Sequence, residues 1–142
     1  MEYVRTSAAL TLTGARAALD AALAHAGDHD LRMNIAVVDP GGALLAFARM
    51  DGAFVHSGGI AIDKARTSVG FGGAPTADLY AALSAEDAVI RGIANRPGVA
   101  AFGGGVPVRV DGRLVGAIGA SGGSAEEDAE VAAAGAAAVG SA

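Results

Sequence analysis

The side chain with the most distinctive chemistry in this sequence is Lys64, because it is the only lysine beside nine arginines. Lysine offers a compact ammonium, a pKa that falls on burial and a nucleophilic amine, none of which arginine supplies. The alternative is an ion pair with a nearby acid such as Asp63, or a chance position on a helix surface. The functional interpretation makes Lys64 a candidate catalytic residue.

A short polar segment just before Lys64 could bind an anion. Ser57, Gly58 and Gly59 stand at the expected start of a helix, where free backbone amides attract negative charge. Lys64 follows one to two turns later, so the two features together could hold a carboxylate. The alternative is an ordinary serine cap followed by flexible glycines. His56 precedes this segment and is a second candidate catalytic residue, as a general acid/base or an axial metal ligand, although a lone histidine is commonly neither.

Three consecutive glycines lie in the segment Phe102-Gly103-Gly104-Gly105-Val106-Pro107. Ordering three glycines is costly, and a simple turn needs only one or two. One interpretation places their backbone amides against a ligand, which makes Phe102, Gly103, Gly104 and Gly105 candidate ligand-binding residues. The other is a bulge or a sharp corner before a strand.

Several other classes of site lack support in the sequence. The glycines of residues 116–123 do not have the spacing of a dinucleotide-binding loop, and no Walker A motif occurs. His25 and His29 are four residues apart, but Gly27 between them is expected to end the helix, and no third zinc ligand is apparent. The chain has no cysteine, no Gly-x-Ser-x-Gly elbow and no His-Glu-x-x-His motif. We therefore predict no metal site.

Composition limits the partners. The 142 residues carry a formal net charge of −5, with the arginines dispersed and no basic stripe. Nucleic-acid binding and a cationic membrane-surface helix are therefore not expected. No apolar run approaches the ~20 residues of a membrane-spanning helix. The first residues do not resemble a signal peptide, so we expect a cytoplasmic protein.

The elements that must position these residues follow from turn and cap signals, and they predict one α+β domain over residues 1–142. Two hairpins are expected, one closed by residues 39–42 and the other by Asp111-Gly112. Ser124 and Glu127 form a capping box for the last helix, and Val37, Leu45, Val108, Val115 and Ile118 are the expected core. Helices are expected from Thr11 or Thr13 to about 25, at 58–69, 76–83, 86–91 and 125–139, and strands at 33–38, 43–49, 99–102, 106–110 and 113–120.

Several of these motifs in order resemble the GlcG/HbpS-like family. They are Ile35–Gly42, Phe47–Gly52, Ile60–Ala65, Pro75-Thr76, Phe102–Pro107, Val115–Gly123 and Glu127-Asp128. The likeness covers roughly residues 10 to 140. It implies a profilin-like fold with a five-stranded antiparallel sheet flanked by helices, and homo-oligomers such as dimers or larger rings. Because Thr76 is part of one of these motifs, the resemblance also makes it a candidate ligand-binding residue. Some relatives bind or degrade haem, and others are associated with glycolate or corrinoid metabolism.

Two functions follow from the residues and the resemblance together. The first is binding of a small molecule, namely haem or another anionic tetrapyrrole, with His56 or Met50 as the available iron ligand. The second is a cofactor-independent enzyme that acts on a small carboxylate-bearing metabolite, with Lys64 or His56 as acid/base. Its reaction would be an isomerisation or a cyclisation through an imine.

Overall fold

A four-stranded antiparallel sheet with the strand order β2-β1-β4-β3 organises the fold. The structure is a computed structural model and describes residues 2–140. The strands are β1 (Asn34–Val38), β2 (Leu44–Arg49), β3 (Gly105–Val110) and β4 (Arg113–Ser121). The helices are α1 (Leu12–Asp28), α2 (His56–Gly70), α3 (Thr76–Leu83), α4 (Asp87–Ala94) and α5 (Ala125–Ala137). The predicted α+β class is confirmed.

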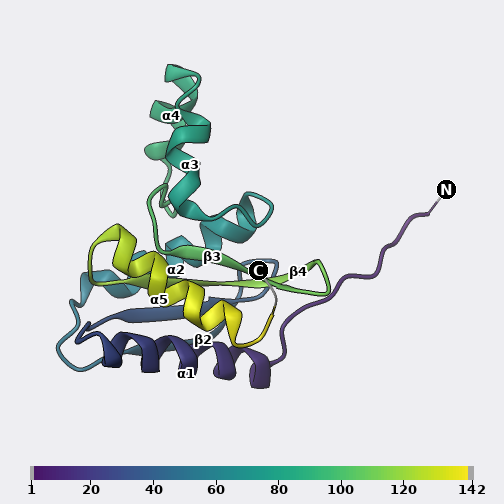
Figure 1. Ribbon diagram of the computed structural model, residues 1–142. Helices are drawn as coiled ribbons and strands as arrows, with labels where there is room; N and C mark the ends of the chain where they lie inside the picture. The colour runs from purple at the N-terminus through teal and green to yellow at the C-terminus, as the bar shows by residue number, and fades with distance from the viewer. Residues whose placement is uncertain (1, 141–142) are drawn as a thin grey trace.

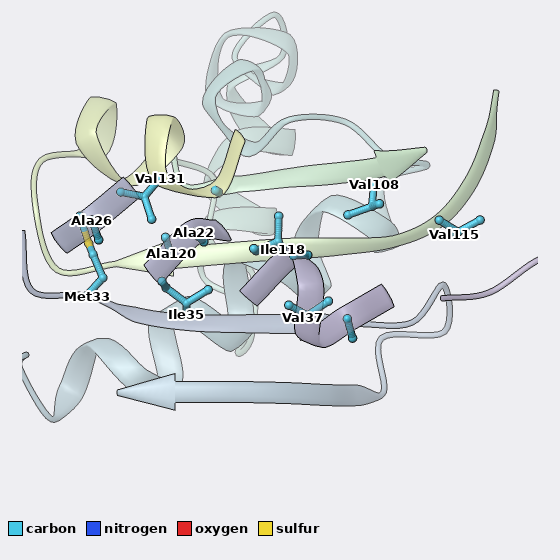
Figure 2. Close-up of a cluster of buried hydrophobic side chains, with 13 residues drawn as sticks. Ala22, Ala26, Met33, Ile35, Val37, Val108, Val115, Ile118, Ala120 and Val131 are labelled. Atoms are coloured by element: carbon cyan, nitrogen blue, oxygen red, sulfur yellow. The ribbon is translucent and has the colours of Figure 1, made fainter. Parts of the chain in front are cut away.

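Helices cover both faces of the sheet. α1 and α5 pack together on one face, and α2 packs on the other, mainly against β4 and β1 (Figure 1). The main core lies between the sheet and the α1–α5 pair (Figure 2). Of the five core residues predicted, Leu45 is half-buried and Val37, Val108, Val115 and Ile118 are buried. Alanines on α1 allow this helix to pack closely on the sheet.

Local sequence signals account for most of the element boundaries. Asp111 and Gly112 both have positive φ, +52° and +75°, as a two-residue hairpin turn requires. The Thr11 hydroxyl accepts a hydrogen bond from the Gly14 amide and caps α1. Both hydrogen bonds of the capping box between Ser124 and Glu127 are present at the start of α5.

Three predictions about secondary structure are wrong. Residues 99–102 do not form a strand, because the Ala100 amide donates to the Thr67 hydroxyl of α2 and not to a neighbouring strand. The sheet therefore has four strands and not five. α1 continues through Gly27, since a glycine only weakens a helix interior, by about 1 kcal/mol. α2 begins at His56 with Val55 as its N-cap, so Ser57 lies inside the first turn and does not cap it.

Helices α3 and α4 form an arm that stands apart from the sheet and the other helices (Figure 1). Only Thr76 and Leu79 of α3 are buried, and α4 has no buried residue. The chain returns from this arm through residues 95–104 to the start of β3. Residues of α3 line a hollow together with the loop that precedes β3 and the start of α5, so these three segments lie close together. None of the helices among residues 2–140 has the length and apolar composition needed to cross a bilayer.

Candidate functional site

The ammonium of Lys64 is fully buried and has three partners. Its Nζ donates to the Ala120 carbonyl at 3.1 Å and to Asp128 Oδ2 at 2.7 Å. It also lies 4.6 Å from the centroid of the Phe102 ring, within the range of a cation–π interaction. The partner of Lys64 is thus Asp128, which is distant in sequence, and not the neighbouring Asp63.

Lys64 reaches Asp128 past the end of the sheet. It extends from α2 on one face, whereas Asp128 belongs to α5 on the other. Gly104 leaves room for it, because a Cβ there would lie 2.7 Å from both Cδ and Nζ of Lys64. Gly104 also has φ +135°, which side chains rarely adopt. A side chain at Gly105 would collide with the Lys64 carbonyl. The glycines therefore form a close-packed corner before β3. This is the second of the two interpretations given for the segment, a bulge or sharp corner before a strand.

Asp128 is a functional candidate that the sequence analysis missed. Its Oδ1 accepts a hydrogen bond from the Gly123 amide at 2.9 Å, so both carboxylate oxygens are engaged. The capping box fixes the first turn of α5 and hence the position of this side chain. Helical spacing could have revealed it, since Asp128 lies three and four residues before the buried Val131 and Ala132, on the apolar face of α5.

Burial sets the electrostatics of the pair. Loss of hydration lowers the pKa of Lys64 below that of an ordinary lysine, and the hydrogen bond and charge of Asp128 partly oppose this. The amine therefore loses its proton more readily than an exposed lysine. No other ion pair among residues 2–140 is buried, since the remaining one, Asp87–Arg91, lies on the exposed surface of α4.

The predicted site residues fall into two groups. Thr76 lies with the glycine corner, because its hydroxyl accepts a hydrogen bond from the Gly105 amide at 2.8 Å. Lys64 and Phe102 are also there. His56 lies eight residues before Lys64 on α2, or about 12 Å along the helix axis. His56 and the segment 57–59 therefore form a separate group at the start of α2, where His56 is exposed.

The start of α2 lies beside a buried amide side chain. Asn34 is fully buried and donates from Nδ2 to the Phe54 carbonyl at 2.8 Å, while its Oδ1 has no partner among the described residues. A Cβ on Gly58 would lie 3.5 Å from this oxygen. Gly58 therefore allows close packing of α2 on β1, whereas a side chain at Gly59 would meet open space.

Phe102, which contacts the Lys64 ammonium, also lines an apolar groove, here called the Tyr80–Phe102 groove. Its volume is about 510 Å³, and it lies between α3, the loop before β3 and the start of α5. The lining residues are Ala77, Tyr80, Ala101, Phe102, Gly103, Ala125, Glu126 and Ala129. Tyr80 is 63% exposed and Phe102 49% exposed. The Phe102 ring thus makes a cation–π contact with Lys64 and also lines the groove.

The exposure of these two rings is part of a wider pattern. The sequence has four phenylalanines, two tyrosines and no tryptophan. Each of these six side chains is at least 38% exposed, so the core contains no aromatic ring. Aromatic side chains carry large contact areas, so the exposed rings are available for contact with a ligand or a partner. Among residues 2–140, no cluster of three or more acidic, histidine or cysteine side chains could hold a metal ion.

Comparison with known proteins gives consistent results. A model of the family described as haem degrading protein HbpS-like matches residues 10–137. The chain is 35% identical over 121 residues to protein GlcG of Escherichia coli K12, covering 83% of this chain and 85% of GlcG. Among solved structures, it resembles an HbpS double mutant from Streptomyces reticuli with a TM-score of 0.86 and 34% identity, over 97% of this chain and 92% of HbpS. It also resembles a PduOC:haem complex with a TM-score of 0.83 and 30% identity, over 92% of this chain and 95% of PduOC.

Proposed function

Since the chain belongs to the HbpS-like family, we propose that it binds haem, or another anionic tetrapyrrole of the same shape, in the Tyr80–Phe102 groove. The observation that carries this proposal is the groove itself. It is apolar, it is flanked by two exposed aromatic rings, and it lies in a chain whose core contains no aromatic side chain. A relative of the same fold is described as a complex with haem.

The lining of the groove fits a flat apolar ring. Its volume falls within the roughly 300–1,000 Å³ typical of small-molecule pockets. Six of the eight lining residues are alanine, glycine or phenylalanine, so contact with the ring face supplies the binding energy. No arginine or lysine is among these eight, and the carboxylates of the ligand therefore contribute little.

The donor set of the groove limits which residue could bind iron. Tyr80 and Glu126 are the lining side chains with oxygen atoms that ligate iron, and tyrosine is a known haem ligand. Neither His56 nor Met50 is among the lining residues. Met50 lines a different hollow with Arg32 and Arg49, and its sulfur accepts a hydrogen bond from the Met33 amide at 3.4 Å. The groove therefore favours Tyr80 over the two ligands expected from the sequence.

The proposal is tested by adding haem to the unaltered protein and following the absorption spectrum. We expect a Soret shift that saturates near one haem per chain, because the groove has room for one flat ligand. Serum albumin and a protein without a haem site serve as positive and negative controls. A shift that grows without saturation, or no shift, contradicts the proposal.

A second candidate function, a cofactor-independent enzyme for small carboxylates, is favoured by one observation: Lys64 is buried and its pKa is lowered. The ion pair with Asp128 argues for a structural role instead, since it engages the ammonium fully. Because Lys64 is the only lysine, the α-amine at the start of the chain is the one other group that trinitrobenzenesulfonate labels, and peptide mapping by mass spectrometry separates the two. We expect no label on Lys64 in the folded protein and rapid labelling of Lys64 in urea. Labelling of Lys64 in the folded state would show a reachable amine and favour the enzyme.

We also propose that the protein is a cytoplasmic homo-oligomer, a dimer or a larger ring, with a profilin-like fold. The family resemblance supports the assembly and the fold. The exposed aromatic side chains support an assembly too, because a monomer would leave all of them in water. Catalysis by Lys64 and His56, with a carboxylate held at Ser57, Gly58 and Gly59, belongs to the second candidate function. Of the predicted ligand-binding residues, Phe102 and Gly103 line the groove, whereas contacts from Thr76, Gly104 and Gly105 stay predictions.

A further inference from the structure

The outer edge of β2 has no proline to block it, in contrast to the opposite edge of the sheet, although a bulge at Leu45 interrupts its pairing with β1. The strand order leaves β2 and β3 at the two borders. β3 contains Pro107, which has no amide to donate and blocks the pairing of further strands. β2 has the sequence Leu-Leu-Ala-Phe-Ala-Arg, without proline or lysine, and its only charge is at its last residue. Natural sheets rarely leave such an apolar edge open.

The register identifies which backbone groups of β2 face outward. The Met50 amide donates to the Met33 carbonyl, and the pairing continues with Asn34 opposite Arg49. Hydrogen-bonded and non-hydrogen-bonded pairs alternate in an antiparallel ladder. Ala46 and Ala48 therefore bond to β1, whereas the backbone groups of Phe47 and Arg49 point away from it. These groups form a template for another strand.

Exposed apolar side chains lie around this edge. Leu44 is 46% exposed and Phe47 is 38% exposed. A Cβ on Gly58 would lie 3.3 Å from the Phe47 ring, which places the start of α2 over this part of β2. Just before α2, Phe54 is 69% exposed and Val55 is 76% exposed. The backbone template and the apolar side chains thus belong to one surface.

We propose that β2 pairs antiparallel with β2 of a second copy of this chain, with Phe47 opposite Phe47 across a two-fold axis. Such a pair is self-complementary, so one chain provides both edges. It satisfies the outward backbone groups of Phe47 on both copies, and aromatic pairs across strands are favourable. It also places the two Arg49 side chains at opposite ends of the shared ladder, so like charges do not meet.

A second copy accounts for these features more fully than another protein would. The edge requires an apolar strand with no charge near its centre, and β2 is itself such a strand. This inference assigns a surface to the proposed homo-oligomer, on which it rests, and it is independent of haem binding. The Tyr80–Phe102 groove contains no residue of β2 or of residues 54–55.

The test is amide hydrogen exchange measured by NMR, together with light scattering, on the unaltered protein. In the pair, the Phe47 and Arg49 amides should exchange as slowly as those of Ala46 and Ala48. Arg49→Pro removes an outward amide and should give a monomer, whereas Arg49→Ala keeps the amide and should remain paired. The exchange data on the unaltered chain decide the question even if the proline variant does not fold.

Two results would overturn the inference, and they have different meanings. A monomer at micromolar concentration would overturn both this surface and the proposed homo-oligomer. An oligomer in which Phe47 and Arg49 exchange rapidly, while Ala46 and Ala48 are protected, would overturn the β2 surface alone. Neither result affects the haem titration, because that experiment tests the Tyr80–Phe102 groove and not the edge of β2.

Discussion

Replacing Asp128 by alanine is expected to lower the free energy of unfolding by about 3–5 kcal/mol, the cost of removing one partner of a buried ion pair. The variant leaves the Lys64 ammonium without its counter-charge in a position with no solvent exposure. It also removes the acceptor of the Gly123 amide. The measurement is urea denaturation followed by circular dichroism.

Two further variants separate the ion pair from general effects on α5. Glu130→Ala removes an exposed charge from the same helix and should change stability by no more than about 0.5 kcal/mol. The double variant Lys64→Met with Asp128→Leu should recover most of the loss, because apolar side chains of similar size often replace a buried pair without cost. If Asp128→Ala costs as little as Glu130→Ala, the Lys64–Asp128 contact does not hold α2 and α5 together.

Local signals in the sequence were sufficient to predict most of the fold. The Asp111-Gly112 turn, the Thr11 cap and the capping box of α5 each depend on residues within four positions of one another. Their outcome is therefore set by local geometry. The prediction for residues 99–102 was wrong because an apolar run does not specify its partner. Here the Thr67 hydroxyl, 33 residues away, accepts the hydrogen bond from the backbone amide of Ala100.

The candidate site was only partly predictable for the same reason. Lys64 was distinctive by composition, and the glycines by their number, so the sequence indicated both as candidates. The partner of Lys64 is 64 residues away, and nothing near Lys64 indicates it. The Tyr80–Phe102 groove combines α3, the loop before β3 and the start of α5, and these segments meet only in the folded chain. Tyr80 and Glu126 were missed because each is an ordinary exposed helix residue in the sequence.

If haem binds against Phe102, replacing this residue by alanine should weaken haem binding strongly. Burial of a phenylalanine side chain contributes roughly 1.5–3 kcal/mol, so a loss of about 10- to 100-fold in affinity is expected. Phe71→Ala is the matched control, because Phe71 is 38% exposed at the end of α2 and does not line the groove. Circular dichroism would verify that both variants fold.

The most direct measurement is thus the haem dissociation constant of three proteins, obtained by Soret titration under identical conditions. We expect the unaltered chain and Phe71→Ala to bind haem equally well, while Phe102→Ala binds at least ten-fold more weakly. Equal affinity of all three proteins, or a loss confined to Phe71→Ala, would contradict the assignment of the Tyr80–Phe102 groove as the haem site.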